Sequence, residues 1–195
     1  IDTFAFRNEN PNIQIFEMDH PVTQKYKLER IHELEWNIPK NVHYVPIDFE
    51  KENMERALIK SGFDKNKKTF FSILGVTYYL TLPVFGETIK NISKLSTNGN
   101  RILFDYPDET TFAKRNPAKR VRRLTEITAS LGETMKQGFS YESLKTILYK
   151  YGFDADEHMT PKKIQSAFFE GRNDNHHAFE NVHFISAIYR KEVKK

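Results

Sequence analysis

The sequence predicts an α/β fold built on a doubly wound, mostly parallel β-sheet. Short apolar segments rich in β-branched and aromatic residues alternate with longer segments of helical periodicity. This alternation is typical of parallel strands joined by right-handed helical crossovers. The 195 residues are enough for a sizeable core, and we find no internal repeat or low-complexity segment. We therefore expect a single domain over residues 1–195.

Strands and helices alternate regularly in the first half of the chain. Tyr26, Ile31 and Leu34 recur at helical spacing in the first predicted helix. Gly62 stands just past the second helix, where glycine commonly ends a helix. Pro83 suits the first turn of the third helix. The predicted order is strand 13–17, helix 22–35, strand 43–47, helix 53–61, strand 69–74, helix 83–95 and strand 101–106.

The second half departs from this alternation. A basic segment at about 113–131 is predicted to form a helical insertion. Ser140 and Thr160 are suited to cap the amino ends of two later helices. The connection 171–181 is too polar for a long crossover helix, which favours a closing hairpin and an antiparallel last strand. The predicted elements are helix 141–151, strand 153–158, helix 161–170 and strand 182–190.

Two of the predicted strands are followed by an acidic residue. Asp19 closes the first apolar run before Pro21, and Asp48 closes the second. Ligands of open α/β sheets bind beyond the carboxyl ends of the strands, where an acid commonly holds the ribose hydroxyls of a nucleoside cofactor. Phe49 is able to lie against an adenine face, and His20 either lines the adenine side or is polar surface. As an alternative, each acid caps the helix that follows it.

Composition excludes several kinds of site. The chain has no cysteine, which rules out disulfides, a cysteine-based zinc site and a cysteine nucleophile, and fits a cytoplasmic protein. No apolar run approaches the ~20 residues that a membrane-spanning helix needs. The net charge of +4 does not call for a nucleic-acid partner. His176 and His177 are adjacent and have no third ligand at useful spacing, so we predict no metal site.

Four segments carry a family resemblance. In order and spacing they resemble the leucine carboxyl methyltransferase family of S-adenosylmethionine-dependent enzymes, in particular its bacterial branch. The resemblance implies a Rossmann-like methyltransferase fold with an antiparallel last strand, and an enzyme that uses S-adenosylmethionine. The segments are Asp2-Thr-Phe-Ala-Phe-Arg7, Phe16-Glu-Met-Asp-His-Pro21, Val45-Pro-Ile-Asp-Phe49 and Ser72-Ile-Leu-Gly-Val-Thr-Tyr-Tyr-Leu80.

The resemblance also implies roles for individual residues. The family acid that matches Asp19 binds the ribose hydroxyls, and the one that matches Asp48 holds the adenine amino group, with the backbone of Phe49 at the ring. Leu74 departs from the pattern, because the family usually has glutamate there, so a carboxylate near the charged end of the cofactor would be lost. We interpret the Leu74 side chain as strand core whose backbone borders the pocket.

Tyr78 and Tyr79 follow the same strand, where substrate-facing loops belong in this fold. Either tyrosine lines the methyl-transfer cleft or both are packing residues. The basic cluster in the insertion is interpreted as a solvated helix face or, alternatively, as an anion site. No aromatic platform accompanies it, which argues against a groove for single-stranded nucleic acid. Its members are Lys114, Arg115, Lys119, Arg120, Arg122 and Arg123.

In the family a first strand and a glycine-rich turn precede the segment that matches Asp2–Arg7. The resemblance therefore implies that this chain corresponds to the C-terminal two thirds of a family member, without the first strand. Because that strand is central in such sheets, its neighbours would lack a hydrogen-bonding partner. We expect residues 1–195 alone to be poorly stable or associated, and inactive.

The predicted function is O-methylation of a small molecule or a protein. A carboxylate acceptor is already ionised at neutral pH, whereas a hydroxyl needs a general base. No residue in the sequence is marked as such a base, which favours a carboxylate or an activated acceptor and leaves the catalytic residues unassigned. The alternative function is a non-catalytic nucleotide- or RNA-binding module, suggested by the basic helix.

Overall fold

The computed structural model describes residues 3–49, 51–112, 119–130, 135 and 137–190. The chain divides into two compact units, Ile1–Lys65 and Asn66–Lys195. The strands among the described residues form two hydrogen-bonded sheets, one of two strands in the first unit and one of four strands in the second. The single domain expected from the sequence stays a prediction. None of the described helices is long and apolar enough to cross a membrane.

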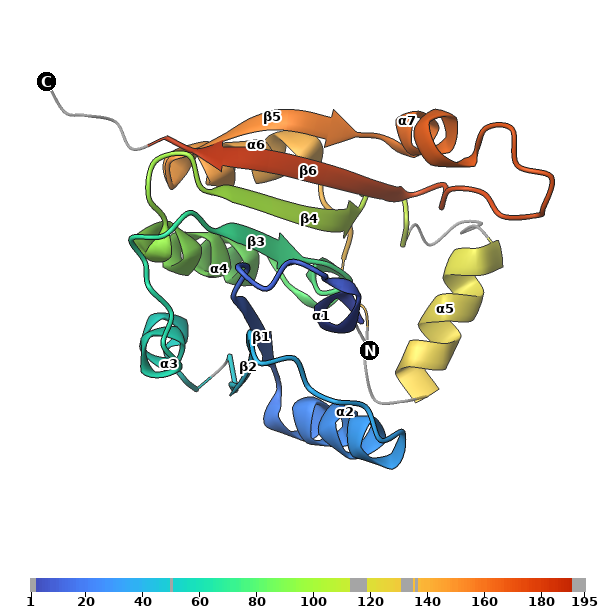
Figure 1. Ribbon diagram of the computed structural model, residues 1–195. Coiled ribbons are helices and arrows are strands. Elements are labelled where there is room, and N and C mark those ends of the chain that lie inside the picture. Colours follow the sequence, from blue (N-terminus) through green and yellow to red (C-terminus); the bar gives the residue numbers. More distant parts are fainter. Residues whose placement is uncertain (1–2, 50, 113–118, 131–134, 136, 191–195) are drawn as a thin grey trace, which may run out of the picture. The chain divides into compact units, whose positions relative to one another are not determined.

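The first unit contains two parallel strands that are connected along the chain by one long helix (Figure 1). β1 and β2 pair in register from Ile15 opposite Val42 to Asp19 opposite Pro46. Because the strands are parallel, their carboxyl ends lie at the same edge. The elements are α1 (Phe4–Arg7), β1 (Ile15–Asp19), α2 (Pro21–Glu33), β2 (Val42–Pro46) and α3 (Met54–Lys60).

A buried ion pair holds α2 against β1. Lys27 is only 3% exposed, and its Nζ lies 2.5 and 2.6 Å from the two carboxylate oxygens of Glu17. Gln24 donates from Nε2 to the Glu17 carbonyl oxygen at 3.1 Å. A buried charge is costly unless it is paired, so this geometry favours one position of the helix on the strand. The apolar core of the unit includes Ile31, Val45, Ile47 and Leu58.

The second unit contains a four-stranded sheet in the order β3-β4-β6-β5. β3 is parallel to β4, and β6 is antiparallel to both β4 and β5. The carboxyl ends of β3, β4 and β5 therefore share one edge with the amino end of β6. The elements are β3 (Phe70–Ile73), η1 (Thr77–Tyr79), α4 (Leu82–Leu95), β4 (Arg101–Pro107), α5 (Lys119–Ser130), α6 (Tyr141–Lys150), β5 (Phe153–Met159), α7 (Pro161–Ile164), η2 (Gln165–Phe169) and β6 (Val182–Tyr189).

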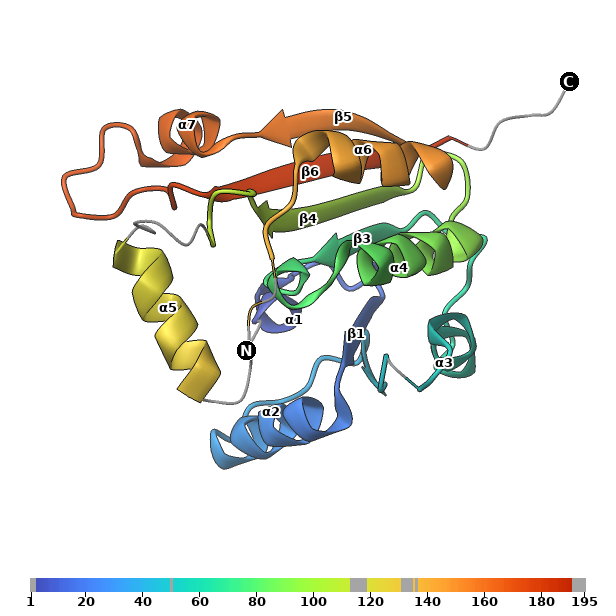
Figure 2. The ribbon, with the colours of Figure 1, turned by 180° about the vertical axis from the view of Figure 1, so that it is seen from behind.

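α4 and α6 cover one face of this sheet (Figure 2). Side chains of β4 alternate between the faces, and Ile102, Phe104 and Tyr106 are buried. The ring of Phe85 on α4 lies 5.0 Å from that of Phe104, measured between centroids. The predicted α/β class, with parallel strands and an antiparallel last strand, is confirmed.

Local signals in the sequence placed several helix ends to within two residues. The hydroxyl oxygen of Ser140 accepts a hydrogen bond from the Ser143 amide at 3.2 Å, and that of Thr160 accepts one from the Lys163 amide at 3.4 Å. Gly62 has a left-handed φ of 90° just beyond α3, as expected for a residue that ends a helix.

The predicted strand 13–17 differs from the structure in its bounds, and the predicted helix 161–170 differs in its type of turn. The strand predicted at 13–17 is shifted, because pairing with β2 begins at Ile15 and includes Asp19 as the last strand residue. The helix predicted at 161–170 is α-helical only to Ile164 and continues as the π-helical η2. The Glu170 amide donates to the Gln165 carbonyl oxygen at 3.0 Å, five residues back, which gives the wider turn.

Candidate functional site

The two predicted acids lie at the carboxyl edge of the β1–β2 pair. Asp19 is the last residue of β1, and its carbonyl oxygen accepts a hydrogen bond from the Ile47 amide at 2.9 Å. Asp48 follows immediately after Ile47. Both acids therefore stand at the same edge, as the strand-end pattern indicated. Their roles in binding a nucleoside stay predictions.

Asp19 does not cap the helix that follows it. The N-cap of α2 is His20, whose Nδ1 accepts a hydrogen bond from the Val22 amide at 3.4 Å. Oδ1 of Asp19 accepts one from the His20 amide at 2.7 Å, which fixes the carboxylate. Oδ2 accepts no hydrogen bond from the described residues. One carboxylate oxygen of Asp19 is thus held in place while the other is available to a hydroxyl donor.

Asp48 does not cap a helix either. Asn53 is the N-cap of α3, while Oδ2 of Asp48 accepts a hydrogen bond from Lys51 Nζ at 2.7 Å. The amides of Lys51 and Glu52 donate to the Asp48 carbonyl oxygen, which makes a tight turn directly beyond the strand. Phe49 is 56% exposed in this turn and offers an apolar surface to a flat ring.

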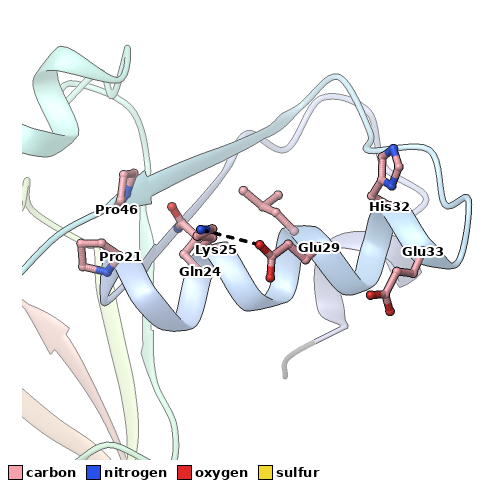
Figure 3. Close-up of a pocket in the computed structure, with 8 residues that line it drawn as sticks. Pro21, Gln24, Lys25, Glu29, His32, Glu33 and Pro46 are labelled. Carbon is pink, nitrogen blue, oxygen red and sulfur yellow. Dashed lines mark ion pairs between the residues drawn. The ribbon is translucent and has the colours of Figure 1, made fainter.

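A hollow of about 590 Å³ lies along α2 (Figure 3). Lys25 and Glu29 face each other in it, with Nζ and Oε1 3.8 Å apart. Neither Asp19 nor Asp48 is among its lining residues, so it is distinct from the predicted nucleoside pocket. Those residues are Pro21, Gln24, Lys25, Leu28, Glu29, His32, Glu33 and Pro46.

In the second unit, Asp105 of β4 organises the loop after β3. Its Oδ1 accepts a hydrogen bond from the Gly75 amide at 2.8 Å, and its Oδ2 accepts one from the Tyr78 hydroxyl at 3.1 Å. Thr77 donates from Oγ1 to the Asp105 carbonyl oxygen at 2.6 Å. Sequence reasoning missed Asp105, because an acid inside a strand carries no local sign that it faces a loop.

Burial determines the protonation of this cluster. Asp105 is 9% exposed, and burial raises its pKa although the hydrogen bonds from Gly75 and Tyr78 partly oppose the shift. Burial also raises the pKa of Tyr78, and the neighbouring Asp105 carboxylate raises it further. The phenol of Tyr78 therefore stays protonated and donates to Asp105 at neutral pH. In this position it holds the loop.

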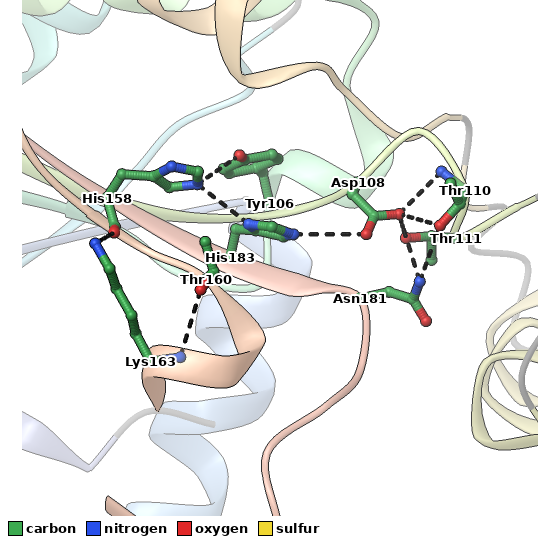
Figure 4. A network of polar contacts seen from close by, with 9 residues as sticks. All are labelled: Tyr106, Asp108, Thr110, Thr111, His158, Thr160, Lys163, Asn181 and His183. Atoms are coloured by element: carbon green, nitrogen blue, oxygen red, sulfur yellow. Dashed lines mark hydrogen bonds and ion pairs between the residues drawn. The ribbon is translucent and has the colours of Figure 1, made fainter. Parts of the chain in front are cut away.

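A second polar network links three strands at the carboxyl edge of the four-stranded sheet (Figure 4). His183 Nε2 on β6 lies 3.5 Å from Oδ2 of Asp108, the residue after β4. His183 Nδ1 lies 3.1 Å from Nε2 of His158 on β5. The Tyr106 hydroxyl on β4 lies 3.0 Å from the same nitrogen of His158.

Asp108, at one end of this network, is held as a carboxylate. Its Oδ1 accepts hydrogen bonds from the Thr110 amide and hydroxyl at 2.9 and 2.7 Å, and from the Thr111 hydroxyl at 3.1 Å. Asn181 donates to it from Nδ2 at 3.4 Å. Burial alone would raise the pKa of Asp108, but these hydrogen bonds outweigh it and lower the pKa below its ordinary value. Asp108 is therefore ionised at neutral pH.

The two histidines of the network are neutral at the same pH. Burial lowers the pKa of His158, and electrostatic repulsion of a second proton by His183 and by Lys163 lowers it further. Burial also lowers the pKa of His183, and Asp108 only partly opposes this. The ring of Tyr141 on α6 stacks on His158 at 4.1 Å between centroids, with 2° between the planes. Sequence reasoning missed this network, whose histidines lie near the end of β5 and near the start of β6.

Comparison with known proteins gives the family. Residues 1–93 match the family model described as leucine carboxyl methyltransferase. A Bacillus subtilis (strain 168) protein named "Putative S-adenosyl-L-methionine-dependent methyltransferase YktD" is 40% identical over 191 residues, which cover 96% of this chain. The chain belongs to the leucine carboxyl methyltransferase family. A Mycobacterium avium (strain 104) protein, named in the same way without a gene symbol, is 30% identical over 119 residues, or 59% of this chain and 39% of that protein.

Solved methyltransferase structures share the fold at low sequence identity. The mitomycin 7-O-methyltransferase MmcR has a TM-score of 0.55 and 10% identity, covering 92% of this chain and 43% of that one. The N-methyltransferase NodS from Bradyrhizobium japonicum WM9, in complex with S-adenosyl-L-homocysteine, has a TM-score of 0.50 and 14% identity, covering 91% of this chain and 67% of that one. At identities this low, the likenesses establish the fold alone. One of the two names specifies methyl transfer to oxygen and the other methyl transfer to nitrogen.

The chain spans 62% of the length of its Bacillus subtilis relative in the leucine carboxyl methyltransferase family.

The interpretation of Leu74 as strand core is wrong. β3 ends at Ile73, and Leu74 is 52% exposed. The chain leaves the strand here because Gly75 has a left-handed φ of 71° and donates its amide to Asp105. Two calls stay predictions: that the Leu74 backbone borders the cofactor pocket, and that Tyr78 or Tyr79 lines the methyl-transfer cleft.

The remaining candidates have local partners. Arg120 on α5 lies over the Phe179 ring at 3.9 Å, and its Nη1 is 4.0 Å from Glu180 Oε1. His177 Nε2 is 2.8 Å from Arg120 Nη1, and His176 Nδ1 is 3.1 Å from Asp174 Oδ2. In the part of the chain that the structure describes, no three His, Cys, Asp or Glu side chains are grouped to hold a metal. Two members of the basic cluster, Lys114 and Arg115, lie outside the described residues.

Proposed function

We propose that this protein binds S-adenosylmethionine and transfers its methyl group to an oxygen atom of a small molecule or a protein. Membership of the leucine carboxyl methyltransferase family supports the reaction class. The observation that carries the proposal is the placement of Asp19 and Asp48 at one edge of a parallel strand pair. In α/β folds this edge is where nucleoside cofactors bind.

The residues at this edge fit the nucleoside part of the cofactor. Oδ2 of Asp19 would accept hydrogen bonds from the ribose hydroxyls, while the His20 amide holds the carboxylate in place through Oδ1. Asp48 would accept one from the adenine amino group, and the exposed ring of Phe49 would cover the base. S-adenosylmethionine would supply a methyl group bonded to a sulfonium.

The alternative of an RNA-binding module has less support. Of the basic residues on α5, Arg120 is engaged by Phe179 and Glu180, and Arg122 Nε lies 3.9 Å from Glu126 Oε1. Arginines that interact with the protein in this way are less available to a phosphate backbone. The absence of cysteine fits the further proposal that the protein is cytoplasmic.

Calorimetric titration of the complete natural protein with S-adenosylhomocysteine tests this function. We expect binding, and we expect Asp19→Ala to weaken it by about 1.5–3 kcal/mol, the usual cost of losing a hydrogen bond to a charged group. Glu9→Ala removes the same charge at an exposed position in the same unit and should leave the affinity unchanged. An absence of binding would refute the proposal, and equal affinities of the two variants would refute the role of Asp19.

A further inference from the structure

The two acids at the carboxyl edge of β1 and β2 differ in what their carboxylates already contact. In Asp19, Oδ1 accepts a hydrogen bond from the His20 amide, and Oδ2 accepts none from the described residues. In Asp48, Oδ2 accepts a hydrogen bond from Lys51 Nζ at 2.7 Å. An ammonium group is a strong donor to a carboxylate. A ligand that uses this oxygen of Asp48 must therefore compete with a side chain of the protein.

The turn that carries Lys51 is held by other contacts. The Lys51 and Glu52 amides donate to the Asp48 carbonyl oxygen at 3.0 and 2.8 Å. Oε2 of Glu52 accepts a hydrogen bond from the Asp48 amide at 3.0 Å. These three hydrogen bonds do not involve the Lys51 side chain, so we expect the turn to persist when that side chain moves or is replaced.

The exposure of the two partners shows which one can leave. The side chain of Lys51 is 78% exposed, whereas that of Asp48 is 21% exposed. An exposed ion pair contributes little to stability, because water solvates both charges well and because holding a long side chain in one position costs entropy. Lys51 can therefore return to water at a small cost in free energy, while Asp48 stays in place at the end of β2.

From these contacts we propose that Lys51 competes with the adenine amino group for the Asp48 carboxylate and thereby lowers the affinity for the cofactor. The proposal rests on the proposed cofactor site and concerns residues of the first unit alone. On binding, an N–H of the adenine amino group replaces the Lys51 ammonium at Asp48, and no covalent bond changes. The net contribution of Asp48 is the difference between these two interactions, so it should be smaller than that of Asp19.

Calorimetric titration of the complete natural protein and of Lys51→Met with S-adenosylhomocysteine provides the first test. This ligand lacks the sulfonium and has no net charge at neutral pH, so the loss of a distant lysine charge should not change its affinity. Lys51→Met should bind it about 2- to 5-fold more tightly, which corresponds to the usual strength of an exposed ion pair. Lys40→Met removes an exposed lysine before β2, at the other end of that strand, and should leave the affinity unchanged.

A double-mutant cycle ties the effect to Asp48. In an Asp48→Asn background the carboxylate is gone, so adding Lys51→Met should bring no further gain in affinity. Salt gives an independent measurement, because raising KCl from about 50 to about 500 mM screens exposed ion pairs. Higher salt should strengthen binding to the natural protein and to Lys40→Met more than it strengthens binding to Lys51→Met.

The possible results separate this inference from the proposal on which it rests. An unchanged or weaker affinity in Lys51→Met overturns the competition and leaves the cofactor site standing. An equal gain from Lys51→Met in the Asp48→Asn background also overturns it, since the lysine would then act elsewhere. An absence of binding to the natural protein overturns the cofactor proposal and this inference together.

Discussion

Tyr78→Phe isolates the hydrogen bond that ties the loop after β3 to Asp105. The substitution removes only the hydroxyl that donates to Asp105 Oδ2 at 3.1 Å. A hydrogen bond to a charged group contributes about 1.5–3 kcal/mol, and the value here should lie within this range because Asp105 is buried. Urea denaturation at pH 7 should show that loss. Tyr149→Phe, at an exposed position on α6, is the matched control and should cost less than about 0.5 kcal/mol.

The pKa of Asp105 also determines whether the stability loss in Tyr78→Phe grows or shrinks with pH. Burial raises the folded-state pKa of Asp105 above its ordinary 3.8, so its stabilising contribution is present below 3.8 and is lost as pH rises through the folded value. Without the Tyr78 donor the folded pKa rises further, and the variant loses more stability over the same interval. The difference between the two proteins should therefore be larger at pH 7 than at pH 4. An equal difference at both values would refute this account of the Asp105 site.

Two further predictions concern buried charges and the histidine pair. Lys27→Met should destabilise the fold by about 3–5 kcal/mol, because Glu17 is left unpaired, and adding Glu17→Gln should recover part of this loss in urea denaturation. His158 and His183 have lowered pKa values, so the stability that they contribute is present above their ordinary 6.5 and is lost as pH falls through the lower folded values. The double variant His158→Gln and His183→Asn should show a weaker dependence of the unfolding free energy on pH below 6.5. An unchanged dependence would contradict this prediction.

Part of the candidate site was predictable because it depends on strand direction. Asp19 and Asp48 each close an apolar run, and two parallel strands bring their carboxyl ends to one edge whatever their exact register. The contacts of these acids were not predictable. The N-cap of α2 is His20 and not Asp19, because the bond depends on the angles at which the chain turns after β1.

The sequence by itself determined the order and type of the main elements, since apolar periodicity and caps such as Ser140 and Thr160 act over a few residues. Only the tertiary structure decided which polar groups meet. His158 bonds Tyr106 across 52 residues and His183 across 25, and both contacts follow from the pairing of β6 with β4 and β5. Strand register depends on the packing of the whole sheet, because a shift of one residue turns every side chain to the opposite face.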